Sequence, residues 1–183
     1  IFMILYFQFK TVSTSLIVFS GIFVAWSGGF LMIWLYGQGW FMNFSIFDVN
    51  MRDLFQMHPI NLSVAVWVGF LALFGIATDD GVIISTYLKQ SFSERKPTSI
   101  KEIREATVFA GSRRIRPAMM TASTTILALI PVLTSTGRGS DVMVPMAIPS
   151  FGGMVFVILT TFVVPILYAA VAERQFNSQK RKY

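Results

Sequence analysis

Several long apolar stretches constrain the fold of this chain more than any other feature of its sequence. Hydrophobic residues make up 54% of the 183 residues. A stretch of about 20 predominantly apolar residues is long enough to cross the hydrocarbon core of a bilayer as a helix. Inside a bilayer the backbone has to satisfy its own hydrogen bonds, which helices do within one segment. The sequence therefore predicts an all-α integral membrane protein.

The apolar stretches predict one partial and four full transmembrane helices. The chain opens with "IFMILYFQFK", already apolar and without a starting Met, so we expect the C-terminal part of a longer polytopic bundle. Pro117 suits the first turn of its helix, where the missing N–H does no harm. The predicted order is a partial helix at 1–9, helices at 12–36, 63–88, 117–136 and 148–172, loops at 37–62, 89–116 and 137–147, and a tail at 173–183.

The basic residues predict the orientation of these helices. All but two of the 15 Lys and Arg residues lie in the first turn, in the loop 89–116 or in the tail. Arg52 and Arg138 are the two on the other side. The positive-inside rule places the basic side in the cytoplasm, which leaves the loop 37–62 in the periplasm and the C-terminus cytoplasmic. Because topology explains the net charge of +6, no nucleic-acid partner is expected.

Both long loops contain a predicted short helix. In the basic loop, Ser99 and Glu102 fit a capping box, and an apolar stripe predicts an amphipathic helix over 99–112 on the membrane surface. In the periplasmic loop, Asp48 is a candidate N-cap for an interfacial helix over about 49–57. We expect membrane lipid to be the partner of both.

The periplasmic loop contains residues that could bind a soft metal ion. Met42, Met51, Met57 and His58 offer thioether and imidazole groups, which are ligands for Cu(I) and similar ions. The alternative is that the methionines fill space on an interfacial helix and that His58 is a turn residue before Pro59. With no Cys in the chain, disulfides and thiolate metal sites are excluded.

Two adjacent carboxylates, Asp79 and Asp80, interrupt the apolar run "GFLALFGIATDDGVIISTYL". An ionised Asp at the centre of a spanning helix costs roughly 2.5–3.5 kcal/mol on insertion scales, and such residues usually mark ion paths or proton relays. Neighbours on a helix differ in direction by about 100°, so the two side chains face different surroundings. We predict that they carry protons. The alternative is a pair that is hydrogen-bonded to Ser or Thr and has no role in transport.

Small and hydroxyl residues accompany the acidic pair. Gly75 and Gly81 bracket it and permit close helix approach. The helix 117–136 is rich in hydroxyls, with Thr121 and Thr125 spaced i, i+4 on one face. These two threonines are predicted members of the proton relay. Their alternative role is to hydrogen-bond back to their own helix.

Four strings resemble the last helices of one transporter superfamily. They are "GFLALFGIATDDGVII", "RRIRPAMMTASTTILALIPVL", "GRGSDVMVPMAIPSFGGM" and "VVPILYAA". They resemble the heavy-metal efflux branch (CusA/CzcA-like) of the resistance–nodulation–division (RND) superfamily. The resemblance implies an AcrB-like helical bundle in the bacterial inner membrane. It also implies a homotrimeric proton antiporter that joins a periplasmic adaptor protein and an outer-membrane channel.

The resemblance assigns roles to single positions. Asp79 falls where the family keeps an ionisable relay residue, and Thr121 falls on the threonine of the R-P-x-x-M-T motif, which belongs to the same relay. Met143 falls where a copper- or silver-exporting relative has a methionine on its membrane metal path. Two departures are Ala118, where metal exporters can have lysine, and Asp80, where relatives often have an uncharged residue.

We therefore expect a secondary active transporter rather than an enzyme. It would exchange protons for heavy-metal cations of the Cu/Ag or Zn/Co/Cd class through a tripartite complex, with no resident cofactor. A multidrug or lipid-exporting RND permease is one alternative, and a membrane assembly subunit without transport of its own is another. A hydrolase lacks support, because the chain has one His, no Cys, no H-E-x-x-H and no G-x-S-x-G motif.

Overall fold

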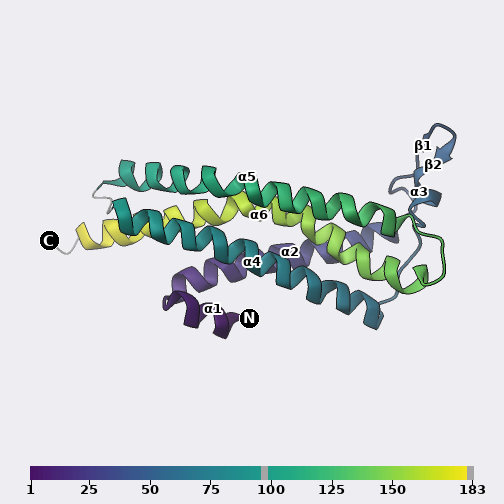
Figure 1. Cartoon of the computed structure of the whole chain (residues 1–183), viewed down its shortest axis with the longest axis horizontal. Helices are drawn as coiled ribbons and strands as arrows, with labels where there is room; N and C mark the ends of the chain where they lie inside the picture. The colour runs from purple at the N-terminus through teal and green to yellow at the C-terminus, as the bar shows by residue number, and fades with distance from the viewer. Residues whose placement is uncertain (96–98, 181–183) are drawn as a thin grey trace. The chain divides into compact units, whose positions relative to one another are not determined.

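The computed structural model of the chain describes residues 1–95 and 99–180. Its elements, in order, are α1 (Phe2–Phe9), α2 (Val12–Tyr36), β1 (Ser45–Ile46), β2 (Val49–Asn50), α3 (Met51–Leu54), α4 (Val64–Arg95), α5 (Ile100–Leu133) and α6 (Ser140–Lys180) (Figure 1). Four of the helices are long and apolar enough to cross a membrane, namely α2, α4, α5 and the stretch Ser140–Arg174 of α6. The predicted all-α class is confirmed.

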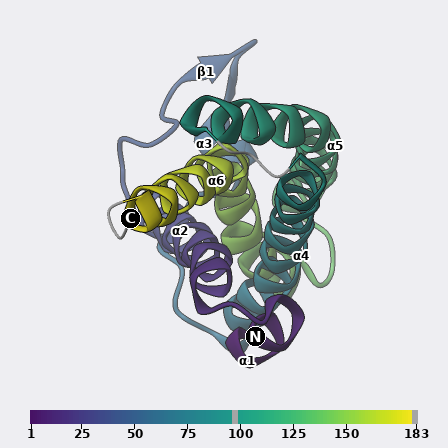
Figure 2. The same ribbon diagram turned by 90° about the vertical axis from the view of Figure 1, so that its left-hand side faces the viewer.

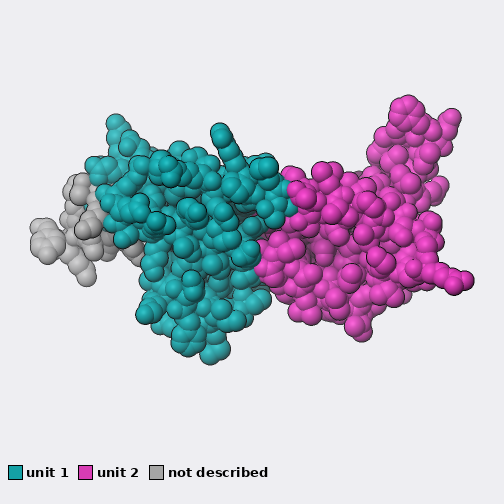
Figure 3. Space-filling model, in the orientation of Figure 1, with its two compact units in different colours: residues 1–23, 77–121, 158–183 teal, residues 24–76, 122–157 magenta. Residues whose placement is uncertain are grey.

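The chain forms two compact units, and each long helix contributes one stretch to each unit. Unit 1 contains residues 1–23, 77–121 and 158–183, and unit 2 contains residues 24–76 and 122–157 (Figure 3). The division falls within all four long helices, so each unit is a cluster of helix segments that are far apart in the sequence.

The core of unit 1 joins all four long helices. Ile17 of α2, Ile84 and Leu88 of α4, Ala110 of α5 and Val164 of α6 are buried together. A second buried cluster, formed by Leu5, Phe9 and Val18, packs α1 against α2 (Figure 2). A few polar contacts add to this apolar core. The Oγ atom of Ser91 on α4 donates to the carbonyl oxygen of Ala106 on α5 at 3.2 Å, and Arg104 on α5 forms an ion pair with Glu173 on α6.

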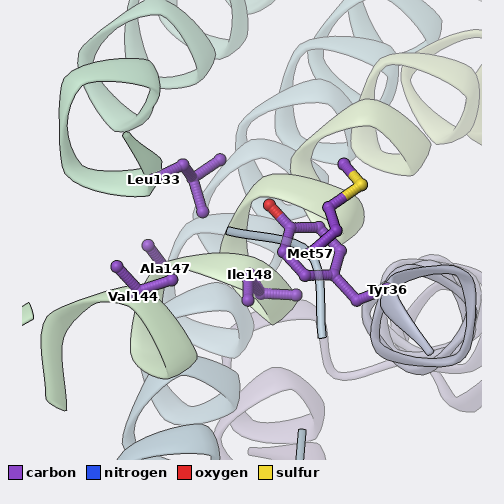
Figure 4. Packing of buried hydrophobic residues seen from close by; sticks show 6 residues of the cluster. All are labelled: Tyr36, Met57, Leu133, Val144, Ala147 and Ile148. Atoms are coloured by element: carbon purple, nitrogen blue, oxygen red, sulfur yellow. The ribbon is translucent and has the colours of Figure 1, made fainter. Parts of the chain in front are cut away.

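The core of unit 2 lies between the end of α2, the end of α5 and the start of α6. Its buried residues are Tyr36, Met57, Leu133, Val144, Ala147 and Ile148 (Figure 4). Elsewhere in this unit glycines bring backbones together. A Cβ on Gly152 of α6 would lie 2.7 Å from the carbonyl oxygen of Gly28 on α2. Such small residues allow helices to pack closely where burial in lipid provides no hydrophobic driving force.

The helices extend beyond the predicted membrane spans. Helix α5 starts at Ile100 and passes through Pro117 to Leu133, so the placement of Pro117 in a first helical turn was wrong. The predicted surface helix over 99–112 and the predicted span over 117–136 form one helix, because the intervening "GSRRIR" contains helix-forming arginines. Helix α6 likewise starts inside the predicted loop 137–147 and continues into the predicted tail. The membrane bounds themselves stay predictions.

The loop between α2 and α4 contains a small hairpin that the sequence analysis did not predict. Strands β1 and β2 pair antiparallel, with Ile46 opposite Val49. The two turn residues, Phe47 and Asp48, have φ values of 52° and 62°, as a type I′ turn requires. Asp48 is therefore not a helix cap. Asn50 caps the short helix α3 instead, with its side chain accepting a hydrogen bond from the backbone N–H of Arg52 at 2.9 Å.

Candidate functional site

The acidic pair lies within α4, and its two side chains face different surroundings. Asp79 is exposed, whereas Asp80 is half-buried. The Oδ2 atom of Asp80 is buried and has no hydrogen-bond partner among the described residues. An ionised carboxylate without hydrogen-bond donors is costly inside a protein. The surroundings of Asp80 therefore favour a neutral carboxyl group or the entry of a donor.

Asp80 lines a small cavity between three helices of unit 1. The cavity is lined from α2 by Val18 and Gly21 and from α4 by Asp80 and its neighbours along that helix. From α6 it is lined by Thr160 and Thr161. About 10 Å³ is open to the centre of a water-sized sphere, which is close to the least that holds one water molecule. No Lys or Arg is among the residues that line it. Within this cavity, the groups that can hydrogen-bond to Asp80 are hydroxyls.

The close approach of α2 to α4 beside this cavity depends on Gly81. A Cβ at this position would lie 2.9 Å from Cγ1 of Val18. The predicted role of Gly81 in close helix approach is confirmed. The same prediction for Gly75 was wrong within the described chain, because nothing lies within 4 Å of a Cβ built there.

Thr160 and Thr161 are functional candidates that the sequence analysis missed. They are 7% and 3% exposed, and both line the cavity beside Asp80. The available signal was a pair of adjacent hydroxyl residues inside the apolar run "VILTTFVV". The hydroxyl residues predicted to belong to the relay lie in the predicted helix 117–136 instead.

The two predicted relay threonines of α5 differ in their placement. The hydroxyl of Thr121 donates to the carbonyl oxygen of Pro117 at 3.0 Å, which is the contact with its own helix that was the alternative to a relay role. Thr125 is half-buried and belongs to unit 2, whereas Asp79, Asp80 and Thr121 belong to unit 1. A relay role for either threonine stays a prediction.

The candidate metal ligands of the loop between α2 and α4 lie in different surroundings. Met57 is 6% exposed and packs against Tyr36 in the core of unit 2 (Figure 4). His58 is exposed, and its Nδ1 lies 2.6 Å from the carbonyl oxygen of Gln56. Met51 is half-buried in α3. Among the described residues, no group of three or more His, Asp or Glu side chains is placed to hold a metal ion.

Met143 lies in the first turns of α6 and is not one of the residues of the unit 2 core. Its side chain is 45% exposed, whereas the neighbouring Val144 is buried in the core of unit 2. The thioether of Met143 is therefore accessible to an ion in a way that the buried thioether of Met57 is not.

Comparison with known proteins identifies the family. Residues 55–172 match the AcrB/AcrD/AcrF family. The chain is 34% identical over 181 residues to the cation efflux system protein CusA of Escherichia coli (strain K12), a match that covers 92% of this chain and 15% of CusA.

Other relatives are named for the metals to which they confer resistance. The chain is 29% identical over 169 residues to the cobalt-zinc-cadmium resistance protein CzcA of Cupriavidus metallidurans, covering 92% of this chain and 13% of CzcA. It is 29% identical over 136 residues to the nickel-cobalt-cadmium resistance protein NccA of Alcaligenes xylosoxydans xylosoxydans, covering 74% of this chain and 12% of NccA. The chain thus spans a small part of the length of these relatives. It belongs to the AcrB/AcrD/AcrF family, within the heavy-metal efflux branch of the RND superfamily.

Proposed function

We propose that this chain is the C-terminal membrane part of a proton-driven exporter of heavy-metal cations. The observation that supports this proposal best is the acidic pair in the middle of an apolar helix, with one carboxyl group exposed and the other in a small cavity. Membership of the heavy-metal efflux branch supports the class of substrate. The drug-exporting, lipid-exporting and non-transporting alternatives lack a comparable observation.

Protonation of Asp80 would change the contacts between α4 and α6. A protonated carboxyl group can donate a hydrogen bond to a hydroxyl oxygen of Thr160 or Thr161, whereas an ionised carboxylate can only accept. The two states therefore require different arrangements of the cavity, and the ionised state requires a donor or a water molecule. Binding and release of a proton at Asp80 would thus shift α4 slightly relative to α6. A switch between two such arrangements can couple proton flow to transport.

Asp79 would exchange protons with groups on its exposed side. Its side chain lies on an exposed face of α4. Because the chain spans about 15% of the length of CusA, we infer that the partner of Asp79 belongs to another part of a longer protein. In transporters with internal repeats the path forms between the halves of the bundle.

The proposed exporter acts in a larger assembly. We propose a homotrimer in the bacterial inner membrane that contacts a periplasmic adaptor protein and an outer-membrane channel. The support is membership of this branch of the family. The hairpin β1–β2 belongs to the loop that the charge distribution predicts to be periplasmic, which is the side where such an adaptor would bind.

The decisive experiment is reconstitution of the full-length protein in vesicles with an imposed pH gradient. We expect a heavy-metal cation to move against its gradient and protons to move in the opposite direction, followed by a metal-sensitive dye and a pH-sensitive dye. Metal movement that persists after an ionophore collapses the pH gradient would contradict proton coupling. Movement of a drug or lipid without movement of a metal ion would favour the alternative RND permease.

The orientation is testable by labelling of single cysteines. This chain contains no cysteine, and any cysteine in the rest of the full-length protein is first replaced. Ser45 in β1 and Ser93 in α4 are both exposed, and Ser→Cys is a conservative change at each. In intact spheroplasts a membrane-impermeant maleimide is expected to label the Ser45→Cys protein. The Ser93→Cys protein should be labelled only after the membrane is permeabilised. The reverse pattern would show that the basic side faces the periplasm.

The accessible thioether of Met143 provides a test of the metal class. Met143→Leu keeps the volume and removes the sulfur, so we expect export of Cu(I) and Ag(I) to fall about tenfold, while export of Zn(II) stays unchanged because Zn(II) depends less on thioether ligands. Met57→Leu is the matched control, because its side chain is buried in the core of unit 2. Equal effects of the two variants would exclude a ligand role for Met143.

A further inference from the structure

A pocket opens between the C-terminal part of α4 and the first half of α5, within unit 1. Tyr87, Gln90, Ser91 and Glu94 line it from α4, and Phe109 and Arg113 line it from α5. About 80 Å³ is open to the centre of a water-sized sphere, which is room for a group several times larger than the single water that fits beside Asp80. The pocket is separate from the acidic pair, which lies earlier in α4.

Arginine side chains gather on the aromatic rings of this pocket. The guanidinium carbon of Arg95 lies 4.0 Å from the centroid of the Phe109 ring, and that of Arg113 lies 4.4 Å from the same centroid. Arg114 lies 5.6 Å from the centroid of Tyr87. Stacking on a ring is attractive for a guanidinium and leaves the N–H groups at its edge available for hydrogen bonds.

Within the described part of the chain, no ion pair involves Arg95, Arg113 or Arg114. The ion pair described there joins Arg104 and Glu173, neither of which lines the pocket. Glu94 supplies one carboxylate, and its Oε1 accepts a hydrogen bond from Nε2 of Gln90 at 2.9 Å. Two guanidinium groups held against one ring repel each other, and an anion bound nearby lowers the energy of this repulsion.

We propose that this pocket, which we call the arginine pocket, binds the phosphate headgroup of an anionic phospholipid. A guanidinium group matches two phosphate oxygens at once, and Arg95 and Arg113 approach the same ring from different helices. Apolar surface adjoins the pocket, since Val108 is 70% exposed and Phe109 is 39% exposed. A soluble phosphate would gain nothing from such surface, whereas the glycerol and acyl groups of a lipid would cover it.

The leaflet in which this lipid would lie rests on the proposed orientation, in which the α4–α5 connection faces the cytoplasm. The cytoplasmic leaflet carries anionic lipids, and basic pockets between helices on this side are suited to their headgroups. The arginine pocket would anchor the ends of α4 and α5 at the membrane surface. It would thereby hold the helix that carries Asp79 and Asp80 at a defined depth.

Lipid binding can be measured on the purified full-length protein without any transport assay. Native mass spectrometry with phosphatidylglycerol or phosphatidylethanolamine of the same acyl chains gives the apparent affinity for each lipid. We expect the double variant Arg95→Ala/Arg113→Ala to bind phosphatidylglycerol about tenfold more weakly and phosphatidylethanolamine unchanged. Lys101→Ala is the control, because Lys101 is exposed on α5 and does not line the pocket.

A second measurement needs no substitution and so does not depend on the folding of a variant. In the wild-type protein, phosphatidylglycerol is expected to slow hydrogen exchange in residues 87–95 and 106–114 more than phosphatidylethanolamine does. Equal protection by the two lipids, or equal loss of affinity in Lys101→Ala, would overturn the proposal. Displacement of the lipid by inorganic phosphate at the same concentration would also overturn it, because the site would then select a free anion.

The experiments distinguish an error in the lipid-binding proposal from an error in the proposed export function. Headgroup binding is measured in the absence of metal and of a pH gradient, and neither Arg95 nor Arg113 lies beside the acidic pair. Loss of lipid selectivity with intact metal transport would contradict only the arginine pocket. Labelling of the Ser93→Cys protein from the periplasm would contradict the leaflet but not the binding of an anionic headgroup.

Discussion

Replacing Asp79 with Asn is expected to abolish metal export while leaving the protein in the membrane at its normal level. The amide has nearly the same size as the carboxyl group but can neither take up nor release a proton. A positioned proton-transfer group typically contributes about 10²–10⁴-fold to the rate of its step, so export should fall by about 10²-fold or more. Growth of cells in the presence of the metal and pH-driven uptake into vesicles are the two measurements.

Two further variants separate a relay role from a structural one. Asp79→Glu keeps an ionisable group and should retain part of the activity. Asp80→Asn is expected to accumulate normally and to export poorly, because its amide fills the cavity beside Thr160 and Thr161 without releasing a proton. Full metal resistance in the Asp79→Asn strain would show that Asp79 is not a relay residue. Full resistance in the Asp80→Asn strain would limit Asp80 to a hydrogen-bonding role.

Replacing Gly69 with Ala is expected to destabilise the packing of α4 against α6 in unit 2. The added Cβ would collide with the carbonyl oxygen of Met146 and would lie 2.8 Å from Cγ of Pro149. The hydroxyl of Ser150 donates to the carbonyl oxygen of Gly69 at 3.0 Å, and this bond would be strained as the helices separate. Overpacking of this kind typically costs about 1–3 kcal/mol, and here the obstacle is backbone. The thermal midpoint of the purified protein in detergent is the measurement.

Gly75→Ala is the matched control on the same helix. Nothing lies within 4 Å of a Cβ at Gly75, and Ala is favoured over Gly in a helix interior by about 0.5–1 kcal/mol. We therefore expect the Gly75→Ala protein to be at least as stable as the wild type. Equal thermal midpoints for the two variants would show that the close contact at Gly69 does not limit stability.

The positions of the helices followed from the sequence because hydrocarbon imposes one solution on a long apolar run. The predicted spans 12–36 and 63–88 lie within or almost within α2 and α4, and the family resemblance, carried by strings such as "GFLALFGIATDDGVII", is confirmed by the comparisons. The ends of the helices were less predictable. A polar segment rich in Arg, Lys and Glu can form part of a helix or part of a loop. Pro117 does not end α5, although proline lacks the backbone N–H donor.

The local structure of the loop between α2 and α4 depended on competition between two short elements. Asp48 and Asn50 are both good N-cap residues, and the sequence does not rank them. Pairing of β1 with β2 places Asp48 in the turn and leaves Asn50 at the start of α3. Contacts between neighbouring segments decide which of the two residues caps the helix. Amino-acid composition does not reveal these contacts.

The sequence by itself determined that two carboxyl groups lie in an apolar helix and that they face different directions, because helical geometry separates neighbours by about 100°. Only the tertiary structure decided which of them enters a cavity and which faces outward. Asp80 lies beside Gly81, where α2 approaches closely, and opposite Thr160 and Thr161 of α6. A carboxyl group and two hydroxyl groups about 80 residues away line the same cavity because of how three helices pack, and no local pattern in the chain encodes that packing.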